Sequence, residues 1–359
     1  MKLRDSLMAL FFLSLLGCNS NATEGIEPED DPLIITERLN YDQLIEKIGI
    51  GRLASIVEIP NAEGALGRNK DGYFHVRFQL AMTTISDYAV TAKSTEALTE
   101  FLRAVNYSFE RQLESGDFEI SIPPHIANIS GFVPPSAEDL TSGTAFFASS
   151  LGISLVSLSR SDWFMNSDET LNFRTQLEQY QSEIELLLNY LISSESILKD
   201  YDQSAPNRLL YDALGYFTLG KYLDRQDAMN LGIEFLNLAL ALSHPEEGYF
   251  IENNGWDSSY NGVALQLGFE LLSLMEYENT SQMESTLLAS ASWQISRILN
   301  SGEISTEGNT RVFPGGESFL GQEKRVDYAK TIRTLLYLKS LTNKDELAVL
   351  AEKVLNFYN

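Results

Sequence analysis

EEGYFIENNGWDSSYNGVALQLG, residues 246–268, is the stretch that decides the fold, because it is a polar, aromatic and glycine-rich loop between two apolar helical runs. The run before it, 228–243, and the run after it, 262–277, repeat apolar residues at helical spacing. Loops carry binding and catalytic residues more often than the elements they connect. We therefore expect a helical scaffold with a site at this loop.

Paired helical segments of the same kind recur along the chain. Each pair has a short polar turn inside it, and long loops rich in Gly, Pro and aromatic residues separate the pairs. The predicted pairs are 76–91 with 95–113, 139–158 with 169–193, 208–223 with 228–243, 262–277 with 282–299, and 327–341 with 345–357, after a helical stretch at 41–57 interrupted by Gly49 and Gly51. Ser94 or Thr95 is the expected cap of the helix that starts there. Short extended pieces are expected at 118–122 and 310–313.

Stacked antiparallel hairpins place all their long loops on one face. Helices 209–223 and 263–275 are apolar almost all round, which predicts burial on both sides, whereas 284–299 has the polar stripe of an outer helix. The sequence therefore predicts an all-α fold, an incomplete (α/α) toroid of about five to six helical hairpins. A tetratricopeptide-like solenoid is the competing arrangement, disfavoured because the spacings are irregular and too long for its repeat.

The charge balance restricts the partners. The 359 residues include 26 Lys and Arg against 50 Asp and Glu, a formal net charge of −24. Nucleic acid is excluded as a partner, since phosphate binding needs a basic surface.

The N-terminus has the pattern of an export signal. Lys2 and Arg4 precede an apolar run that ends in Leu15-Leu16-Gly17-Cys18. This ending resembles the lipobox of bacterial lipoproteins, which implies a signal peptide at 1–17, lipidation of Cys18 and a membrane anchor. An acidic flexible tether is predicted at 18–39 and a single folded domain at 40–359. The implied location is the bacterial cell envelope, as an outer-membrane lipoprotein that is periplasmic or surface-exposed. Cys18 is the chain's one cysteine, so no internal disulfide forms.

The opening loop has the residue types that recognise sugars. Aromatic faces stack on pyranose rings, while amides and carboxylates bond vicinal hydroxyls. The predicted substrate-binding residues are Tyr249, Glu252, Asn253, Trp256, Asp257 and Asn261. Asp257 or Ser258 is also an ordinary N-cap of the helix that follows, and Tyr260 an ordinary core aromatic. The expected partner is a polysaccharide or oligosaccharide.

Gly255-Trp256-Asp257-Ser258-Ser259-Tyr260 with Gln266-Leu267-Gly268 resembles the segment that opens an inner helix in toroidal polysaccharide lyases of the chondroitinase and hyaluronate lyase kind. That resemblance implies β-elimination beside a uronate, with a tyrosine as acid and base. The family's histidine is missing, because Asn261-Gly262-Val263 occupies its place. Gly308-Asn309-Thr310-Arg311 resembles the family's later Gly-Arg segment.

Two chemistries are compatible with the residues. β-Elimination needs a base, an acid and a group that neutralises the uronate, and Tyr260, Asn254 and Arg311 are the candidates. A phenol with a pKa near 10 is a poor base unless a cation lowers that pKa, so Arg311 is expected close to Tyr260. Glycoside hydrolysis needs two carboxylates, for which Asp257 and Glu317 are candidates and Glu252 a substitute.

The three histidines are scattered. His244 is expected at a helix end, and His75, near Tyr73, is the better catalytic candidate. No spacing is typical of a metal site, and no cofactor motif occurs. Three functions stay open: a carbohydrate-active enzyme, most simply a uronate lyase; a non-catalytic glycan-binding or accessory lipoprotein; and a helical protein-interaction scaffold of the envelope. An anionic ligand requires Arg68, Lys70, Arg311, Lys324 or Arg325 to gather at one place.

Overall fold

Several helices begin at side chains that bond the free N–H groups of a first turn. Asn40, Ser94, Ser136 and Asp257 each accept such a bond. The computed structural model describes residues 32–359, and Leu33–Asn359 form one compact unit. Cys18, the signal peptide and most of the predicted tether lie outside the described residues.

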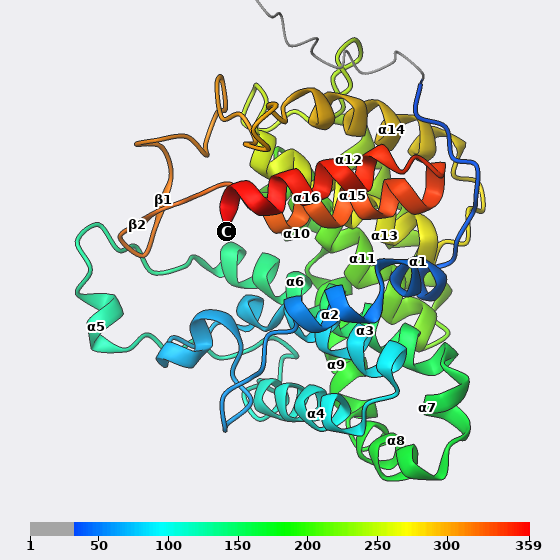
Figure 1. Ribbon diagram of the computed structural model, residues 1–359. Helices are drawn as coiled ribbons and strands as arrows, with labels where there is room; N and C mark the ends of the chain where they lie inside the picture. The colour runs from blue at the N-terminus through cyan, green and yellow to red at the C-terminus, as the bar shows by residue number, and fades with distance from the viewer. Residues whose placement is uncertain (1–31) are drawn as a thin grey trace, which may run out of the picture. The chain divides into compact units, whose positions relative to one another are not determined.

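The described residues form an all-α structure with one small hairpin (Figure 1). The α-helices are α1 (Tyr41–Ile48), α2 (Ile50–Ile56), α3 (Met82–Ala92), α4 (Thr95–Phe109), α5 (Pro124–Ala127), α6 (Ala137–Arg160), α7 (Asp162–Asn166), α8 (Leu171–Glu178), α9 (Gln181–Ser193), α10 (Glu195–Asp202), α11 (Pro206–Tyr222), α12 (Gln226–Ala241), α13 (Ser258–Leu274), α14 (Ser281–Ser296), α15 (Tyr328–Thr342) and α16 (Glu346–Tyr358). The 3-10 helices are η1 (Gly67–Asp71), η2 (Val76–Gln79) and η3 (Asp168–Thr170), and the strands are β1 (Ser318–Phe319) and β2 (Gln322–Glu323).

Four of the five predicted pairs have the expected partners: α3 with α4, α11 with α12, α13 with α14, and α15 with α16. The prediction of one helix over 169–193 is wrong, because the chain bends at Gln179 and Tyr180 between α8 and α9. There the Tyr180 ring stacks on Phe109 of α4 at 5.2 Å, and its hydroxyl donates to Asn106 at 2.6 Å. The bend thus packs the second half of this pair against the first pair.

The extended segments differ from prediction. Residues 310–313 form a bend, and Phe118 makes only an isolated bridge to Gln112. The hairpin lies instead at 318–323, where Leu320 and Gly321 both have positive φ. Two such residues in succession give the turn that matches the twist of paired strands.

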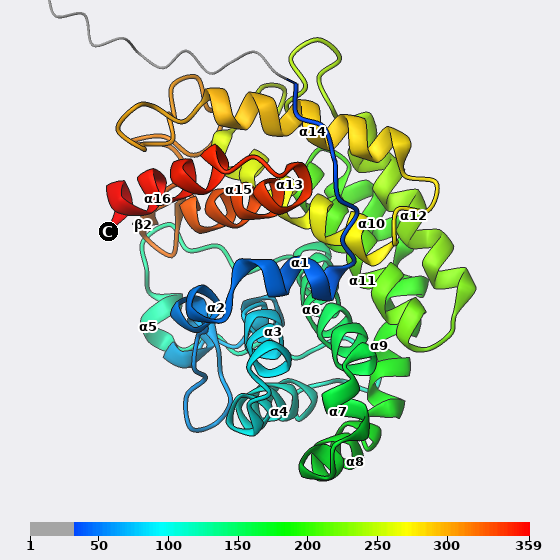
Figure 2. The same ribbon diagram turned by 45° about the vertical axis from the view of Figure 1, so that its right-hand side comes forward.

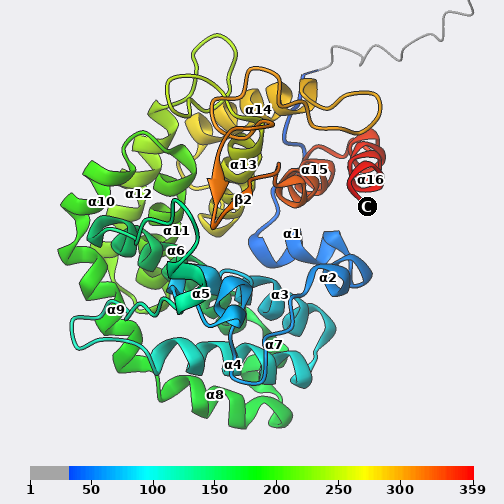
Figure 3. The ribbon, with the colours of Figure 1, turned by 90° about the vertical axis from the view of Figure 1, so that its left-hand side faces the viewer.

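Contacts link the helices in an order that returns to its start. They run from α3 to α6, α11, α13 and α15, and α1 contacts both α15 and α3. In Figure 3, α12, α14 and α16 lie outside α11, α13 and α15. Helix α6 is long and apolar enough to cross a membrane, but it is mostly buried, as core helices are.

A buried charged cluster fixes four of these helices together. Arg333 of α15 pairs with Asp87 of α3 at 2.8 Å and with Glu270 of α13 at 3.3 Å. The Tyr41 hydroxyl of α1 donates to Asp87 at 2.9 Å, and that of Tyr337 donates to Glu270 at the same distance. Each buried charge therefore has a partner of opposite sign, as burial requires.

The end of the predicted tether packs on the helices. Thr36 and Glu37 donate backbone bonds to the carbonyl of Leu341, and Arg38 pairs with Glu284 at 3.2 Å. Leu39 is buried. Figure 2 shows this segment crossing α14 toward α1.

Candidate functional site

A cleft of about 1170 Å³ opens in the part of the chain that the structure describes. Its wall combines aromatic rings with charged side chains. Six cations line it, namely Arg68, Arg77, Arg208, Arg311, Lys324 and Arg325, and four acids, namely Asp139, Glu317, Glu323 and Asp327. The wall therefore has a net charge of +2 in a chain of −24. Such a local excess attracts anions.

Helix N-termini add to this positive character. Residues from the first turns of α6, α11 and α13 line the cleft, together with Asp327, the N-cap of α15. Backbone N–H groups at a helix N-terminus have partial positive charge and favour negative ligands.

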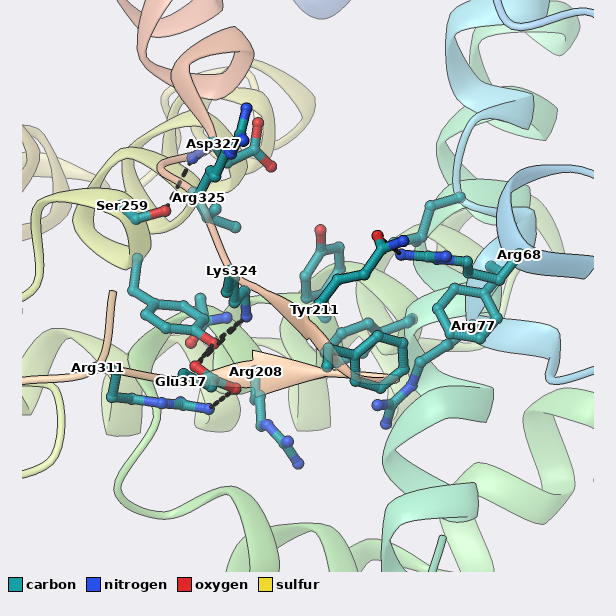
Figure 4. A pocket seen from close by; sticks show the side chains of 18 of the residues that line it. Arg68, Arg77, Arg208, Tyr211, Ser259, Arg311, Glu317, Lys324, Arg325 and Asp327 are labelled. Atoms are coloured by element: carbon teal, nitrogen blue, oxygen red, sulfur yellow. Dashed lines mark hydrogen bonds and ion pairs between the residues drawn. The ribbon is translucent and has the colours of Figure 1, made fainter. Parts of the chain in front are cut away.

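Tyr260 lines the cleft and contacts three charged side chains. Its hydroxyl donates to Glu317 Oε2 at 2.8 Å and also contacts the Lys324 amine. Arg311 and Lys324 each lie 4.3 Å from the centroid of its ring. Arg311 pairs with Glu317 at 3.0 Å and with Glu252 at 2.5 Å. Figure 4 shows Arg311, Glu317 and Lys324 on one side of the cleft and Arg68 and Arg77 on the other.

The pKa of Tyr260 is raised, not lowered as lyase chemistry would need of a base. Burial raises it most, the charge of Arg311 opposes this, and the charge of Glu317 raises it further. The phenol is thus a proton donor near neutral pH. Burial lowers the pKa of Lys324, against the opposing effect of Glu317. A lysine with a lowered pKa is a better base than an exposed one.

The carboxylates do not form the pair needed for hydrolysis. Asp257 is fully buried. One carboxylate oxygen accepts the backbone N–H groups of Ser259 and Tyr260, which makes Asp257 the N-cap of α13. The other oxygen accepts the backbone N–H groups of Arg311 and Val312 and so holds the later loop against the helix start. Burial alone would raise the pKa of Glu317, but the charges of Lys324 and Arg311 lower it. A carboxyl with a lowered pKa is a poor general acid.

Glu252 is buried under the cleft wall, where it holds Arg311. Burial raises the pKa of Glu252, although the hydrogen bond and the positive charge of Arg311 act to lower it.

Other predicted residues of the opening loop do not line the cleft. Tyr249 stacks on His244 at 4.7 Å and packs on Trp293 at 5.2 Å and Trp256 at 5.7 Å. Asn253 and Asn254 are exposed at a tight turn, with φ of 51° and 66°. Tyr249 is thus buried among the rings of His244, Trp256 and Trp293.

Asn261, the first residue of the predicted Asn261-Gly262-Val263 segment, is a buried structural residue. Its amide accepts from the backbone of Phe250 at 2.9 Å and donates to Gln294 at 2.9 Å.

The cleft also contains residues that the sequence did not single out. Asp139 pairs with Arg77 at 2.9 Å and with Arg208 at 3.8 Å. Helix α11 contributes Arg208, Asn207 and Tyr211 to the wall of the cleft. Arg77 follows His75, the sequence's better histidine candidate, by two residues. Arg208 and Tyr211 stand at the start of an apolar helix, where sequence alone does not separate a cleft wall from a core.

No group of His, Cys, Asp and Glu in residues 32–359 is arranged to hold a metal ion. No protein-family model matches the chain, and no curated protein matches it significantly. The argument for function therefore depends on the cleft.

Proposed function

We propose that the protein is carbohydrate-active and binds a uronate-containing polysaccharide in the cleft. The observation that carries this proposal is the gathering of six cations at one cavity of a strongly acidic chain. Aromatic side chains beside them, including Phe78 and the exposed Phe319, provide faces for sugar rings. A polymer with carboxylates and sugar faces fits both features.

We propose that the helices form an (α/α) toroid. The support is the sequence of contacts from α3 through α15, which α1 completes, with α12, α14 and α16 outside it. In such a toroid the inner helices run parallel, which accounts for the convergence of their N-termini at the cleft.

The reaction that best fits the side chains is β-elimination. Lys324 as a neutral amine accepts the proton from C5 of the uronate. The electron pair forms the C4–C5 double bond, the C4–O bond breaks, and the Tyr260 phenol protonates the departing oxygen. Because Lys324 contacts Tyr260, the proton on the ammonium then returns to the phenolate. Arg68 and Arg325, which have no carboxylate within ion-pair distance among the described residues, are free to neutralise the uronate.

A panel of uronate polysaccharides tests this reaction by the ultraviolet absorbance of unsaturated uronates. We expect product from wild type and at least about a hundredfold less from Tyr260→Phe, because general acid catalysis contributes that much. Lys324→Met should be equally slow. Absence of product on every polymer would refute the lyase reaction.

Non-catalytic glycan binding is the second candidate. Glu317 already takes the bonds that Tyr260, Arg311 and Lys324 would give a ligand, and Asn261 is committed to the core. Binding without product, weakened by Arg325→Gln, would favour this function. No binding to any glycan would favour a protein-interaction scaffold.

We also propose that the chain is an outer-membrane lipoprotein anchored through Cys18. The support is the lipobox-like sequence at 15–18. Incorporation of labelled palmitate that Cys18→Ser abolishes would establish the anchor, and equal labelling of the variant would refute it.

A further inference from the structure

Two buried carboxyl groups, those of Asp202 and Asp212, lie behind the part of the cleft wall that α11 forms. Asp202 is the last residue of α10, and Asp212 stands in α11 one turn after Arg208. Neither acid has any exposed surface. Arg208 connects them to the cleft, because it lines the cleft and pairs with Asp202 at 3.1 Å and with Asp139 at 3.8 Å (Figure 4).

These two carboxyl groups lack the donors that two ionised carboxylates would need. Within residues 32–359, neither oxygen of Asp212 accepts a hydrogen bond, and Oδ2 of Asp202 accepts none either. Arg208 donates to Oδ1 of Asp202, the fourth oxygen of the pair. A buried carboxylate without a donor is strongly unfavourable, and a second negative charge beside it makes both worse. A proton on Asp212 removes one charge and provides a donor for the free oxygen of Asp202.

The surrounding charges favour this proton. Burial and then the charge of Asp202 raise the pKa of Asp212 well above its usual range, and the charge of Arg208 offsets only part of this rise. Burial also raises the pKa of Asp202, against the charge of Arg208 and a smaller effect of Arg77. The two acids therefore raise the cost of ionising each other, while one guanidinium serves both.

The helices packed on α11 add no further charge to the pair. The buried residues of α9 and α12 are all apolar, and those of α6 are all uncharged, including Ser142 beside Asp202. Tyr216, the next titratable residue of α11, has a pKa that burial raises first and the charge of Asp212 raises further. Its phenol thus stays neutral over the range in which the acids titrate.

The protonation of the pair sets the charge of this side of the cleft. With one proton on the pair, Arg77 and Arg208 balance Asp139 and Asp202. Without that proton, three carboxylates face two guanidinium groups, and the net charge is −1. The added charge also attracts Arg208 toward the buried pair and away from Asp139. An anion in the cleft would then meet a less favourable wall.

We propose that Asp202 and Asp212 share one proton at neutral pH and are positioning residues for Arg208, so that loss of this proton at higher pH withdraws the guanidinium from the cleft and weakens anion binding. Both acids are buried behind Arg208, so they act through it and not on the ligand. The identity of the anion as a uronate rests on the proposed function, but the shared proton does not.

Infrared spectra of the full chain test the shared proton without a ligand, because a protonated carboxyl group absorbs apart from a carboxylate. We expect such a band at about pH 7, far above the ordinary aspartate pKa of about 3.9, and its loss in Asp212→Asn. Asp200→Asn removes an exposed acid of α10 and should keep the band. Identical bands in wild type and Asp212→Asn would overturn the proposal.

A second variant separates sharing from simple burial. Asp202→Asn removes the neighbouring charge, so Asp212 should lose its proton at a lower pH than in wild type. An unchanged midpoint would mean that burial alone holds the proton, and sharing would be refuted.

Nitrogen NMR of the arginine side chains tests the positioning role. The Arg208 signal, identified by its loss in Arg208→Lys, should shift at the pH at which the infrared band disappears. It should stay constant over that range in Asp212→Asn, in which the amide cannot ionise. An Arg208 signal that does not move in wild type would overturn the role assigned to the pair.

Calorimetric titration with an oligogalacturonide measures the effect on binding. Wild type should bind about two- to tenfold more weakly above the midpoint than below it, the effect of one half-buried charge, and Asp212→Asn should lose this difference. Equal pH dependence in wild type and variant would refute the link to the cleft. If no uronate binds at either pH while the infrared and NMR results hold, the proposed function fails and the shared proton stands.

Discussion

Neutralising Arg68 and Arg325 together should weaken binding of a uronate oligosaccharide without unfolding the protein. The other four cations of the cleft pair with carboxylates, so removing any of them breaks an ion pair within the protein. Within residues 32–359, Arg68 has one hydrogen bond, to the amide oxygen of Gln322 at 3.2 Å, and Arg325 is exposed. Arg68→Gln with Arg325→Gln therefore tests charge in the cleft with little effect on the fold.

The expected loss follows from how exposed each group is. A hydrogen bond to a charged group contributes about 1.5–3 kcal/mol when well shielded, and an exposed pair contributes about 0.2–1 kcal/mol. Arg68 is half-buried, so its contribution to binding should fall between these limits. Arg325 is exposed, so its contribution should fall in the lower range. The sum is about 1–3 kcal/mol, which is about a five- to 150-fold loss of affinity.

Calorimetric titration with the best-binding uronate oligosaccharide measures this loss. The difference between wild type and variant should shrink when ionic strength rises from about 0.05 to 0.5 M, because salt screens exposed charges. Lys353→Gln on α16, exposed and outside the cleft, removes one positive charge elsewhere and serves as the control. A double variant that binds within twofold of wild type, or a control that loses as much, would refute the reasoning.

Three further outcomes are expected. Arg333→Met should lower the free energy of unfolding in urea by about 3–5 kcal/mol, because it leaves two buried carboxylates unpaired; a loss below about 1 kcal/mol would contradict the pairing. Burial raises the pKa of Asp87 from 3.8 to about 6 in the folded protein, so its contribution to stability is full below pH 3.8 and is lost as pH rises past 6. Asp87→Asn should therefore flatten the pH dependence of the free energy of unfolding in urea between pH 3.8 and about 6. Any elimination activity should rise with pH to an inflection below the ordinary lysine pKa of 10.5, since Lys324 must be neutral to accept a proton; a rate that falls over that range would exclude Lys324 as the base.

Most of the fold was predictable because helix periodicity and caps are local signals. Ser94, placed between two apolar runs, accepts from the backbone of Ala97 as expected, and Lys93 before it takes a left-handed conformation. The break at Tyr180 was not predictable, since it depends on Phe109 more than seventy positions earlier. Hairpin β1–β2 was missed because Leu320, a residue that rarely has positive φ, occupies its turn.

Only some of the residues that line the candidate cleft were predictable from the sequence. Tyr260, Arg311 and Glu317 converge as the sequence suggested, because Asp257 caps α13 and also accepts from the backbone of Arg311. That one carboxylate brings two loops together across more than fifty residues. Composition alone does not show which side of a loop faces a cavity, and so Tyr249 was assigned to sugar binding although it packs on His244.

The raised pKa of Tyr260 shows why a short distance to a cation was an insufficient criterion for identifying a base. Arg311 lies over the Tyr260 ring, as a lowered phenol pKa would need, yet Glu317 and Glu252 both pair with that guanidinium. Their negative charges offset the effect of Arg311 on the phenol, and burial then dominates, which raises the pKa. The same burial acts in the opposite direction on Lys324, because it disfavours the charged form of an amine. Burial thus makes the phenol a donor and its neighbouring amine an acceptor, which is the division of roles that β-elimination requires.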